Sequence, residues 1–253
     1  MDKGIYTALG SLKADKVKQG NAIHDVSNVS TIGFKKAFEA KVTTYRVDIP
    51  GSLTSRFFRT ADYLGKVNLE AGTRIATDND LDIFIEGQGV MGVYKDSGEL
   101  AFTRRGDLRI DAEGRMVNGE NRIVASDAGG DIILEPGFLY KISKEGVIYG
   151  TNPEEEVAEE VEFGRLLLRD ASNVDLEKME DGLFKVVGEP PGDFAGGDNT
   201  IYVTDRALEG SSVKTFDILA QMIELERSYE MKINIVKTLS ELGESSNSLM
   251  RVT

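Results

Sequence analysis

The two ends of the chain carry a helical pattern of apolar residues, and the sequence between them does not. Apolar residues recur every three or four positions over residues 5–29 and again over residues 211–242, which is the spacing of one face of a helix. In the middle, short apolar runs alternate with glycines and other turn residues, which is typical of strands. The sequence therefore predicts an α+β fold, with N- and C-terminal helices that pair as a coiled coil around a β-rich central domain.

Each expected helix has a seam, meaning the apolar residues that would face the partner helix. Lys16 and Gln19 interrupt the first seam, and Lys232 interrupts the second. The C-terminal helix also has a second apolar stripe, so it can bury one face against its partner helix and another against a neighbouring subunit. The first seam is Ile5, Leu9, Leu12, Ile23 and Val26; the second is Ile218, Met222, Leu225, Tyr229, Val236 and Leu239; the second stripe is Phe216, Leu219 and Ile223.

These patterns divide the chain into four segments. Residues 1–33 are expected to form the N-terminal helix, and residues 208–253 the C-terminal helix. Residues 34–69 show no helical period and are expected to form an extended arm with some strand. Residues 70–207 contain the short strands and are predicted to form the β-rich outer domain.

The first helix needs a turn that leads into the arm. Asn28, Gly33 and Phe34 are the residues expected to form it. Gly33 can adopt the left-handed backbone conformation that commonly ends a helix, because it has no Cβ atom.

The residue types present restrict the chemistry. The chain has no cysteine, which excludes disulfides, thiolate metal sites and a cysteine nucleophile. A catalytic triad or a histidine metal site would depend on the single histidine, His24, which lies inside a predicted amphipathic helix and is expected on its polar face or at an interface. We therefore expect no enzyme activity, catalytic residue, metal site or cofactor.

The net charge of −13 is concentrated in the middle of the chain, whereas residues 1–41 are net positive. An acidic, self-repelling surface makes nucleic acid an unsuitable partner. No apolar run approaches the ~18 residues of a membrane span. The first twenty residues lack the apolar segment and cleavage site of a secretory signal, so we expect no cleavable signal peptide.

The glycines at positions 87, 89 and 92 match the spacing of a dinucleotide-binding fingerprint and follow an apolar run. That fingerprint requires a helix to open at the glycines, so that its N-terminus faces the pyrophosphate. Residues 93–98 instead read as the end of a strand and a turn, so nucleotide binding is not expected.

Four stretches resemble motifs of flagellar rod and hook proteins. Residues 19–36, which end in TIGFKK, closely resemble the N-terminal motif that ends in "AN…T.GFK". Residues 208–239, which begin LEGSSV, are similar to the C-terminal motif "LE.SNV…M…QR.YE". Between them, residues 79–89 resemble "N.LD.AI.G.GFF", and residues 102–108, FTRRGDL, resemble "YTR.G.F". The matches follow the family's order along the whole chain, and the middle is smaller than that of a usual hook protein.

The resemblance implies a structural subunit of the bacterial flagellar basal-body rod. It implies that the terminal helices line an axial tube, with the β domain outside, in a periplasm-spanning rod that transmits torque and encloses the export channel. The implied partners are other rod subunits, of the same and adjacent types, and the flagellar type III export apparatus, which would export the chain without a signal peptide.

Two other classes stay open at this point. A soluble β-rich periplasmic or cell-wall glycan-binding protein would keep its function without residues 1–33 and 211–253. An enzyme would lose activity when single carboxylates are changed and would tolerate changes in the seams.

Overall fold

A computed structural model describes residues 2–37, 41–48, 55–62, 65–154 and 159–250. The chain divides into two compact units. The first, here called the helical unit, comprises Met1–Ser27, Glu39–Leu64 and Lys214–Thr253. The second, here called the β unit, comprises Asn28–Phe38 and Gly65–Val213.

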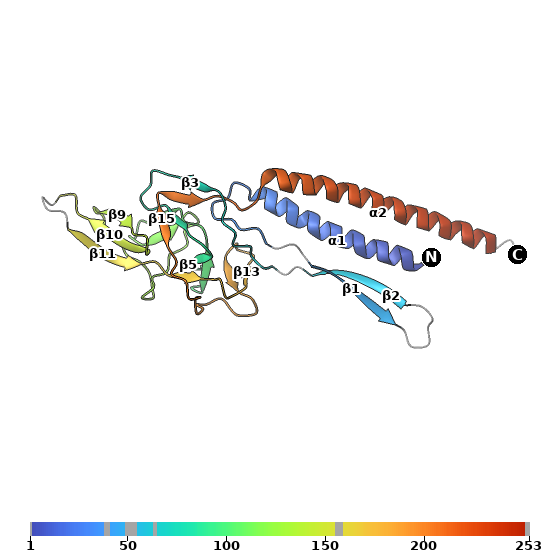
Figure 1. Ribbon diagram of the computed structural model, residues 1–253, viewed down its shortest axis with the longest axis horizontal. Coiled ribbons are helices and arrows are strands. Elements are labelled where there is room, and N and C mark those ends of the chain that lie inside the picture. The colour runs from blue at the N-terminus through green and yellow to red at the C-terminus, as the bar shows by residue number, and fades with distance from the viewer. Residues whose placement is uncertain (1, 38–40, 49–54, 63–64, 155–158, 251–253) are drawn as a thin grey trace. The chain divides into compact units, whose positions relative to one another are not determined.

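The helical unit contains two long helices and a β-hairpin. Helix α1 (Asp2–Ser27) packs against α2 (Thr215–Met250), and strand β1 (Lys41–Asp48) pairs antiparallel with β2 (Ser55–Asp62), which also contacts α1. The start of α1 and the end of α2 lie at the same end of the pair (Figure 1), so the two helices are antiparallel. Asp217 lies in the first turn of α2, where a carboxylate interacts favourably with the positive end of the helix dipole.

The expected α+β arrangement is confirmed, with a helix near each end of the chain and strands between them. The bounds of the helices differ from the sequence-based ones. Helix α1 ends at Ser27, before residue 33, and α2 begins at Thr215, after residue 208, and continues to Met250. Residues 208–213, assigned from the sequence to the C-terminal helix, lie in the β unit.

The β unit is built from short strands, and every strand pair within its described residues is antiparallel. The five-stranded sheet has the order β12-β5-β6-β14-β13, the three-stranded sheet has the order β11-β10-β9, and the remaining pairs are β15-β4, β16-β3 and β7-β8. The strands are β3 (Arg74–Ala76), β4 (Ile83–Ile85), β5 (Gly89–Tyr94), β6 (Leu100–Thr103), β7 (Leu108–Ile110), β8 (Met116–Asn118), β9 (Leu139–Ile142), β10 (Val147–Thr151), β11 (Glu160–Arg165), β12 (Leu168–Asp170), β13 (Leu176–Lys178), β14 (Phe184–Val186), β15 (Val203–Asp205) and β16 (Ala207–Glu209).

The glycines at positions 87, 89 and 92 are followed by a strand and not by a helix. Gly89 and Gly92 belong to β5, which extends to Tyr94. The geometry that a dinucleotide fingerprint requires is therefore not formed at this position, as the sequence indicated.

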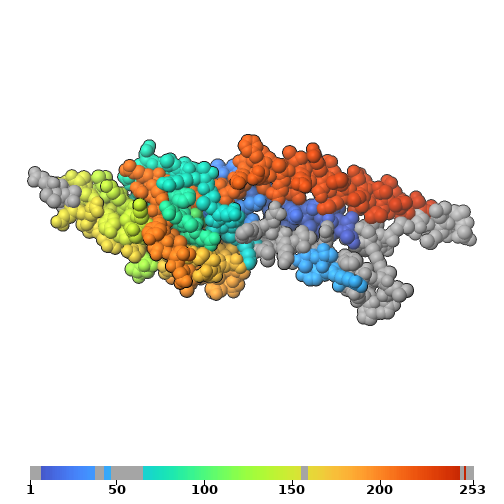
Figure 2. Space-filling model, in the orientation of Figure 1, coloured from blue at the N-terminus to red at the C-terminus, as the bar shows by residue number. Residues whose placement is uncertain are grey.

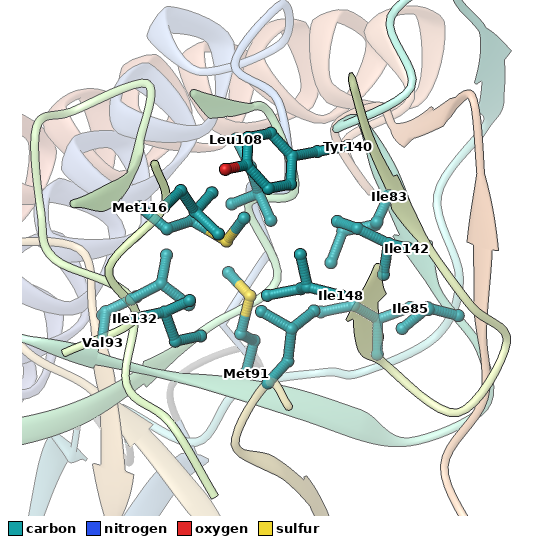
Figure 3. Packing of buried hydrophobic residues seen from close by; sticks show 14 of the residues in the cluster. Ile83, Ile85, Met91, Val93, Leu108, Met116, Ile132, Tyr140, Ile142 and Ile148 are labelled. Carbon is teal, nitrogen blue, oxygen red and sulfur yellow. The ribbon is translucent and has the colours of Figure 1, made fainter. Parts of the chain in front are cut away.

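Two apolar clusters form the core of the β unit, one on each face of the five-stranded sheet. Met91 and Val93 of β5 belong to the first cluster, whereas Val90 of the same strand belongs to the second. The ends of the Met91 and Met116 side chains approach each other in the first cluster, with Ile148 close by (Figure 3). Because both faces of β5 are covered, its sequence is a continuous apolar run and not an alternating one.

Candidate functional site

The contact between α1 and α2 is the first candidate functional feature, and the seam of α2 lies on its protected side. Ile218 is buried, with 3% of its surface exposed. Met222, Leu225, Val236 and Leu239 are half-buried, and Tyr229 is exposed.

The seam expected on α1 is divided between protected and exposed positions. Leu12 is buried and Val26 is half-buried, but Leu9 and Ile23 are 57% and 50% exposed. The side chain of Ile5 lies outside those that the structure describes. The structure therefore brings only part of this seam into the protected side of the helix.

Small and polar residues complete the protected side of α1. Asp15 contacts α2 directly. Ser11 and Leu12 lie four and three positions before Asp15, and Ala22 lies seven positions after it, so all three are on the same side of the helix. All three are buried. Serine and alanine give no hydrophobic signal in a sequence, which explains why the apolar spacing pointed to Leu9 and Ile23 as well.

A polar contact joins the middle of the two helices. Lys232 of α2 forms an ion pair with Asp15 of α1, and the Ser228 hydroxyl donates a hydrogen bond to the Asp15 carboxylate at 3.1 Å. Lys232, which interrupts the apolar seam in the sequence, therefore has a carboxylate opposite it. A polar pair within an apolar helix contact specifies register and orientation, because a shifted register would separate the two charges.

The second stripe of α2 is exposed. The side chain of Phe216 is 87% exposed, and Leu219 and Ile223 are about half exposed. We call these three residues the outer patch. Further along the same face, Glu226 and Glu230 replace the apolar residues, so the outer patch is confined to the first turns of α2.

A further apolar group, Met231, Ile235 and Leu242, is exposed in the second half of α2. In the view of Figure 2 a long side of α2, coloured orange to red, forms part of the molecular surface. Soluble monomers rarely expose several large apolar side chains along one element, and such patches mark sites of interaction.

The turn residues expected after the first helix lie in the β unit. Gly33 has a φ of 69°, as expected for a left-handed turn residue, but it is not the cap of α1, because α1 ends at Ser27. A Cβ atom at position 33 would lie 2.6 Å from the backbone of Arg104 and Arg105, so glycine is needed for the close approach as well. Asn28 accepts a hydrogen bond from the Thr31 hydroxyl at 3.2 Å.

The aromatic ring of Phe34 has a cationic neighbour. The Lys178 ammonium lies 3.5 Å from the centroid of this ring, a cation–π contact within the β unit. This contact and the backbone of Gly33 fix the segment that follows α1 to the β unit.

Sequence reasoning missed a buried charged cluster that we call the junction triad, namely Lys35, Arg104 and Glu209. The Lys35 ammonium donates to Glu209 Oε1 at 2.7 Å, and Arg104 Nε donates to Glu209 Oε2 at 2.7 Å. All three side chains are fully buried. Each residue is a charged member of one of the matched motifs, TIGFKK, FTRRGDL and LEGSSV, but nothing within these motifs indicates that the three side chains meet.

Burial and charge act in opposite directions on the junction triad. Burial lowers the pKa of Lys35 to about 8, with repulsion from Arg104 in the same direction, while Glu209 opposes both. Burial alone would raise the pKa of Glu209, but the hydrogen bonds and charges of Arg104 and Lys35 hold it below its usual range. At neutral pH the carboxylate is therefore ionised and both neighbours are cationic.

Two other features of the described residues concern the alternative protein classes. No group of three His, Cys, Asp or Glu side chains among them is arranged to hold a metal ion. Neither described helix combines the length and apolarity that crossing a membrane requires.

A hollow of about 680 Å³ with a partly polar lining lies in the β unit. Its central cation, Arg169, is paired with Asp127 at 3.0 Å and with Asp193 at 2.9 Å. The charge of Arg169 is therefore satisfied within the protein, and the hollow gives no support to a particular ligand.

Comparisons with known proteins agree with this architecture. The family model of the flagellar hook protein FlgE/F/G D1 domain matches residues 84–150, and that of the flagellar basal body rod FlgEFG protein C-terminal region matches residues 204–249. The FlgF basal-body rod protein of Salmonella typhimurium is 27% identical, and that of Escherichia coli 26%, each over 100% of both chains. The chain is therefore similar along its whole length to proteins of the flagellar basal-body rod family.

Within this family the chain is more like FlgF than FlgG among the relatives compared. The FlgG rod protein of Caulobacter vibrioides is 23% identical over 98% of this chain and 99% of its own length. The start of the sequence, from Met1 to Ala8, and the chain length also resemble FlgF, the proximal rod protein, with the distal rod protein FlgG as the next resemblance. The relatives are named as rod proteins and not as enzymes.

Proposed function

We propose that the chain is a structural subunit of the proximal flagellar rod, which polymerises through its terminal helices into the axial drive shaft. In this role it transmits torque and, with other rod subunits, encloses the export channel. It acts without a catalytic site or a cofactor.

The observation that carries this proposal is the exposure of apolar side chains on α2. Ile218 of α2 is buried, whereas Phe216, Leu219 and Ile223 remain exposed to solvent. Burial of one large apolar side chain contributes roughly 1.5–3 kcal/mol, so a neighbouring subunit that covers the outer patch gains several kcal/mol.

The geometry that such a contact produces supports a rod. In this proposal, a different surface of the next subunit covers the outer patch. Repeated contacts of this kind do not close on themselves and generate a helical filament. The seam residues, including Leu225 and Val236, serve in this proposal as the contact between the two helices of one subunit.

The proposal also explains how assembly is restricted to the growing rod. Isolated helices gain most of their stability from packing, so α1 and α2 stay only marginally ordered until neighbours cover them. The helices then become ordered as they bind, after export of the chain by the flagellar type III apparatus to the basal body.

The test uses a strain that lacks this protein, complemented with the parent chain, with Phe216→Glu, or with Ser240→Glu. Ser240 is an exposed polar residue of α2, so its variant adds the same charge to the same helix away from the outer patch. We expect Phe216→Glu to give a truncated rod, no filament and no swimming, although the protein is made, and Ser240→Glu to restore motility.

Swimming cells with complete basal bodies in the deletion strain would contradict the proposal. Full function of a chain without residues 1–33 and 211–253 would also contradict it and would favour the binding-protein class.

A further inference from the structure

The junction triad connects segments that are far apart in the sequence. Glu209 accepts hydrogen bonds from Lys35, from Arg104 and, at 2.7 Å, from the backbone N–H of Gly72. Lys35 and Glu209 are separated by 174 positions. One carboxylate therefore joins the segment after α1, the strand before α2 and a loop of the β unit.

Arg104 fixes this carboxylate to the sheets. Its Nη1 atom donates to the carbonyls of Gly87 and Gly89 at 2.9 and 2.7 Å, and its Nη2 atom donates to the carbonyl of Ile85 at 2.8 Å. These carbonyls belong to β4, β5 and the turn between them. Arg104 thus holds Glu209 at a fixed place in the β unit.

Lys35 extends the same network to the segment that follows α1. Besides Glu209, its ammonium donates to the carbonyl of Glu70 at 2.6 Å. The backbone adds further bonds, from Gly33 N–H to the carbonyl of Glu209 at 2.7 Å and from Ser212 N–H to the carbonyl of Phe34 at 3.0 Å.

These contacts hold together the segment that follows the end of α1 and the segment that precedes the start of α2. Helix α1 ends at Ser27, just before the first residue of the β unit in sequence, and α2 begins at Thr215, just after the last. Residues 28–37 and 207–213 therefore form a common base that belongs to the β unit.

We propose that Lys35, Arg104 and Glu209 are positioning residues. They hold the end of α1 near the start of α2, so that the two helices pair within one chain as an antiparallel hairpin. Two tethered segments meet at an effective concentration set by the tether, and a short, fixed base raises that concentration. The Asp15–Lys232 contact then selects the register. This role concerns a single chain and goes beyond the polymerisation proposed above.

The buried charges suit this role better than they suit stability. Replacing a buried ion pair with packed apolar residues is often neutral for stability, whereas the pair fixes a specific geometry. In the junction triad, this geometry sets the distance between the segment that follows α1 and the segment that precedes α2.

The absence of cysteine allows a direct test in the full-length chain. Ser11→Cys and Ser228→Cys place a thiol on each helix near the Asp15–Lys232 ion pair and leave that pair in place, and the chain contains no other thiol. The chain is then treated with a short bis-maleimide. The measured quantity is the ratio of the intramolecular crosslink to the intermolecular crosslink, which gives a dimer. The parent double-cysteine chain is compared with the same chain carrying Lys35→Met or Lys66→Met.

Lys66→Met is the matched control, because Lys66 belongs to the β unit and its ion pair with Asp175 is at the surface. We expect Lys35→Met to lower the ratio of intramolecular to intermolecular product at least about fivefold, and Lys66→Met to leave it unchanged. Hydrogen exchange of the β5 and β6 amides shows whether the β unit stays folded.

An unchanged ratio in Lys35→Met overturns the proposal, as does a parent chain that gives only dimers. A ratio that falls only in step with lost protection of β5 and β6 also overturns it, because the triad then has a purely structural role. If Lys35→Met does not fold, Lys35→Gln, which keeps a donor for Glu209, takes its place with the same criteria.

Discussion

The helical unit and the β unit bury their charged groups to different extents. In the helical unit the ion pair between Asp15 and Lys232 is half-buried, whereas Lys35, Arg104 and Glu209 in the β unit have no exposed side-chain surface. The apolar groups differ in the same way. Two clusters fill the β unit, while α2 carries large apolar side chains that are half or more exposed.

The difference teaches which part of the chain folds by itself. The β unit has a packed core and a satisfied charge network, so its stability does not depend on neighbours. The helical unit has one protected side and an exposed outer patch, so its stability depends on what covers it. Changes in the junction triad should therefore have much larger effects on the isolated chain than changes in the helix contact.

The largest effect is expected from Glu209→Gln. Without the carboxylate, two buried cations lose their counter-charge, and breaking a buried pair in this way costs about 3–5 kcal/mol. Denaturant unfolding of the β unit measures the loss. The control is Glu99→Gln, which removes the exposed partner of Lys95 and should leave the midpoint unchanged. Equal stability of the two variants contradicts a structural role for the triad.

A change of pH probes the same charges without mutation. The folded pKa of Lys35, about 8, lies below the ordinary value of 10.5, so between these values the unfolded chain binds more protons and stability rises with pH. The gain is about 1.4 kcal/mol per pKa unit. It should be absent in Lys35→Met. If the free energy of unfolding changes with pH in the same way in the parent chain and in Lys35→Met between pH 8 and 10, this expectation is contradicted.

At acid pH the stability again rises with pH, because the folded pKa of Glu209 is also lowered. The pKa of Glu209 is held below its ordinary value of 4.5, so its contribution is present above 4.5 and is lost as the pH falls through the lower folded value. Acid unfolding of Glu209→Gln should therefore be less steep than that of the parent chain.

Gly33→Ala should have the next largest effect, because it adds a Cβ atom against backbone in a left-handed conformation. The matched control is Gly98→Ala, since Gly98 also has a positive φ of 83° but nothing within 4 Å of a Cβ atom. Strain at such a φ costs about 1–3 kcal/mol, and the close approach at Gly33 adds to it. Thermal unfolding should show a larger loss at position 33. Equal losses would falsify the close approach as the reason for this glycine.

The smallest effect is expected at the helix contact. Asp15→Asn and Lys232→Met, made singly and together, form a double-mutant cycle whose coupling energy we expect at about 0.5–1 kcal/mol, because the pair is only half-buried. The coupling energy is obtained from the thermal loss of helix content in the isolated parent chain, the two single variants and the double variant. A coupling energy of zero means that the pair does not select the register.

The sequence predicted the helices, most of the strands and the family, because these depend on local periodicity and on contiguous motifs. It placed the start of the C-terminal helix at residue 208, inside β16, since three residues are too few to show alternation. It placed Leu9 and Ile23 in the seam, because the alanine and serine that accompany Leu12 on the protected side give no apolar signal.

The junction triad could not be predicted for a different reason. Glu209 lies 174 positions from Lys35 and 105 positions from Arg104, and only folding brings the three charges together. Charged residues in short motifs near apolar strands are usually interpreted as surface groups, and nothing local distinguishes Glu209 from an exposed glutamate.

Hydrogen exchange of the isolated chain and of assembled basal bodies tests the central claim most directly. We predict that the β5 and β6 amides are well protected in both states, whereas the α1 and α2 amides gain protection of about a hundredfold or more on assembly. Helices that are as well protected in the isolated chain as the β unit would contradict the account, because the outer patch would then need no neighbour.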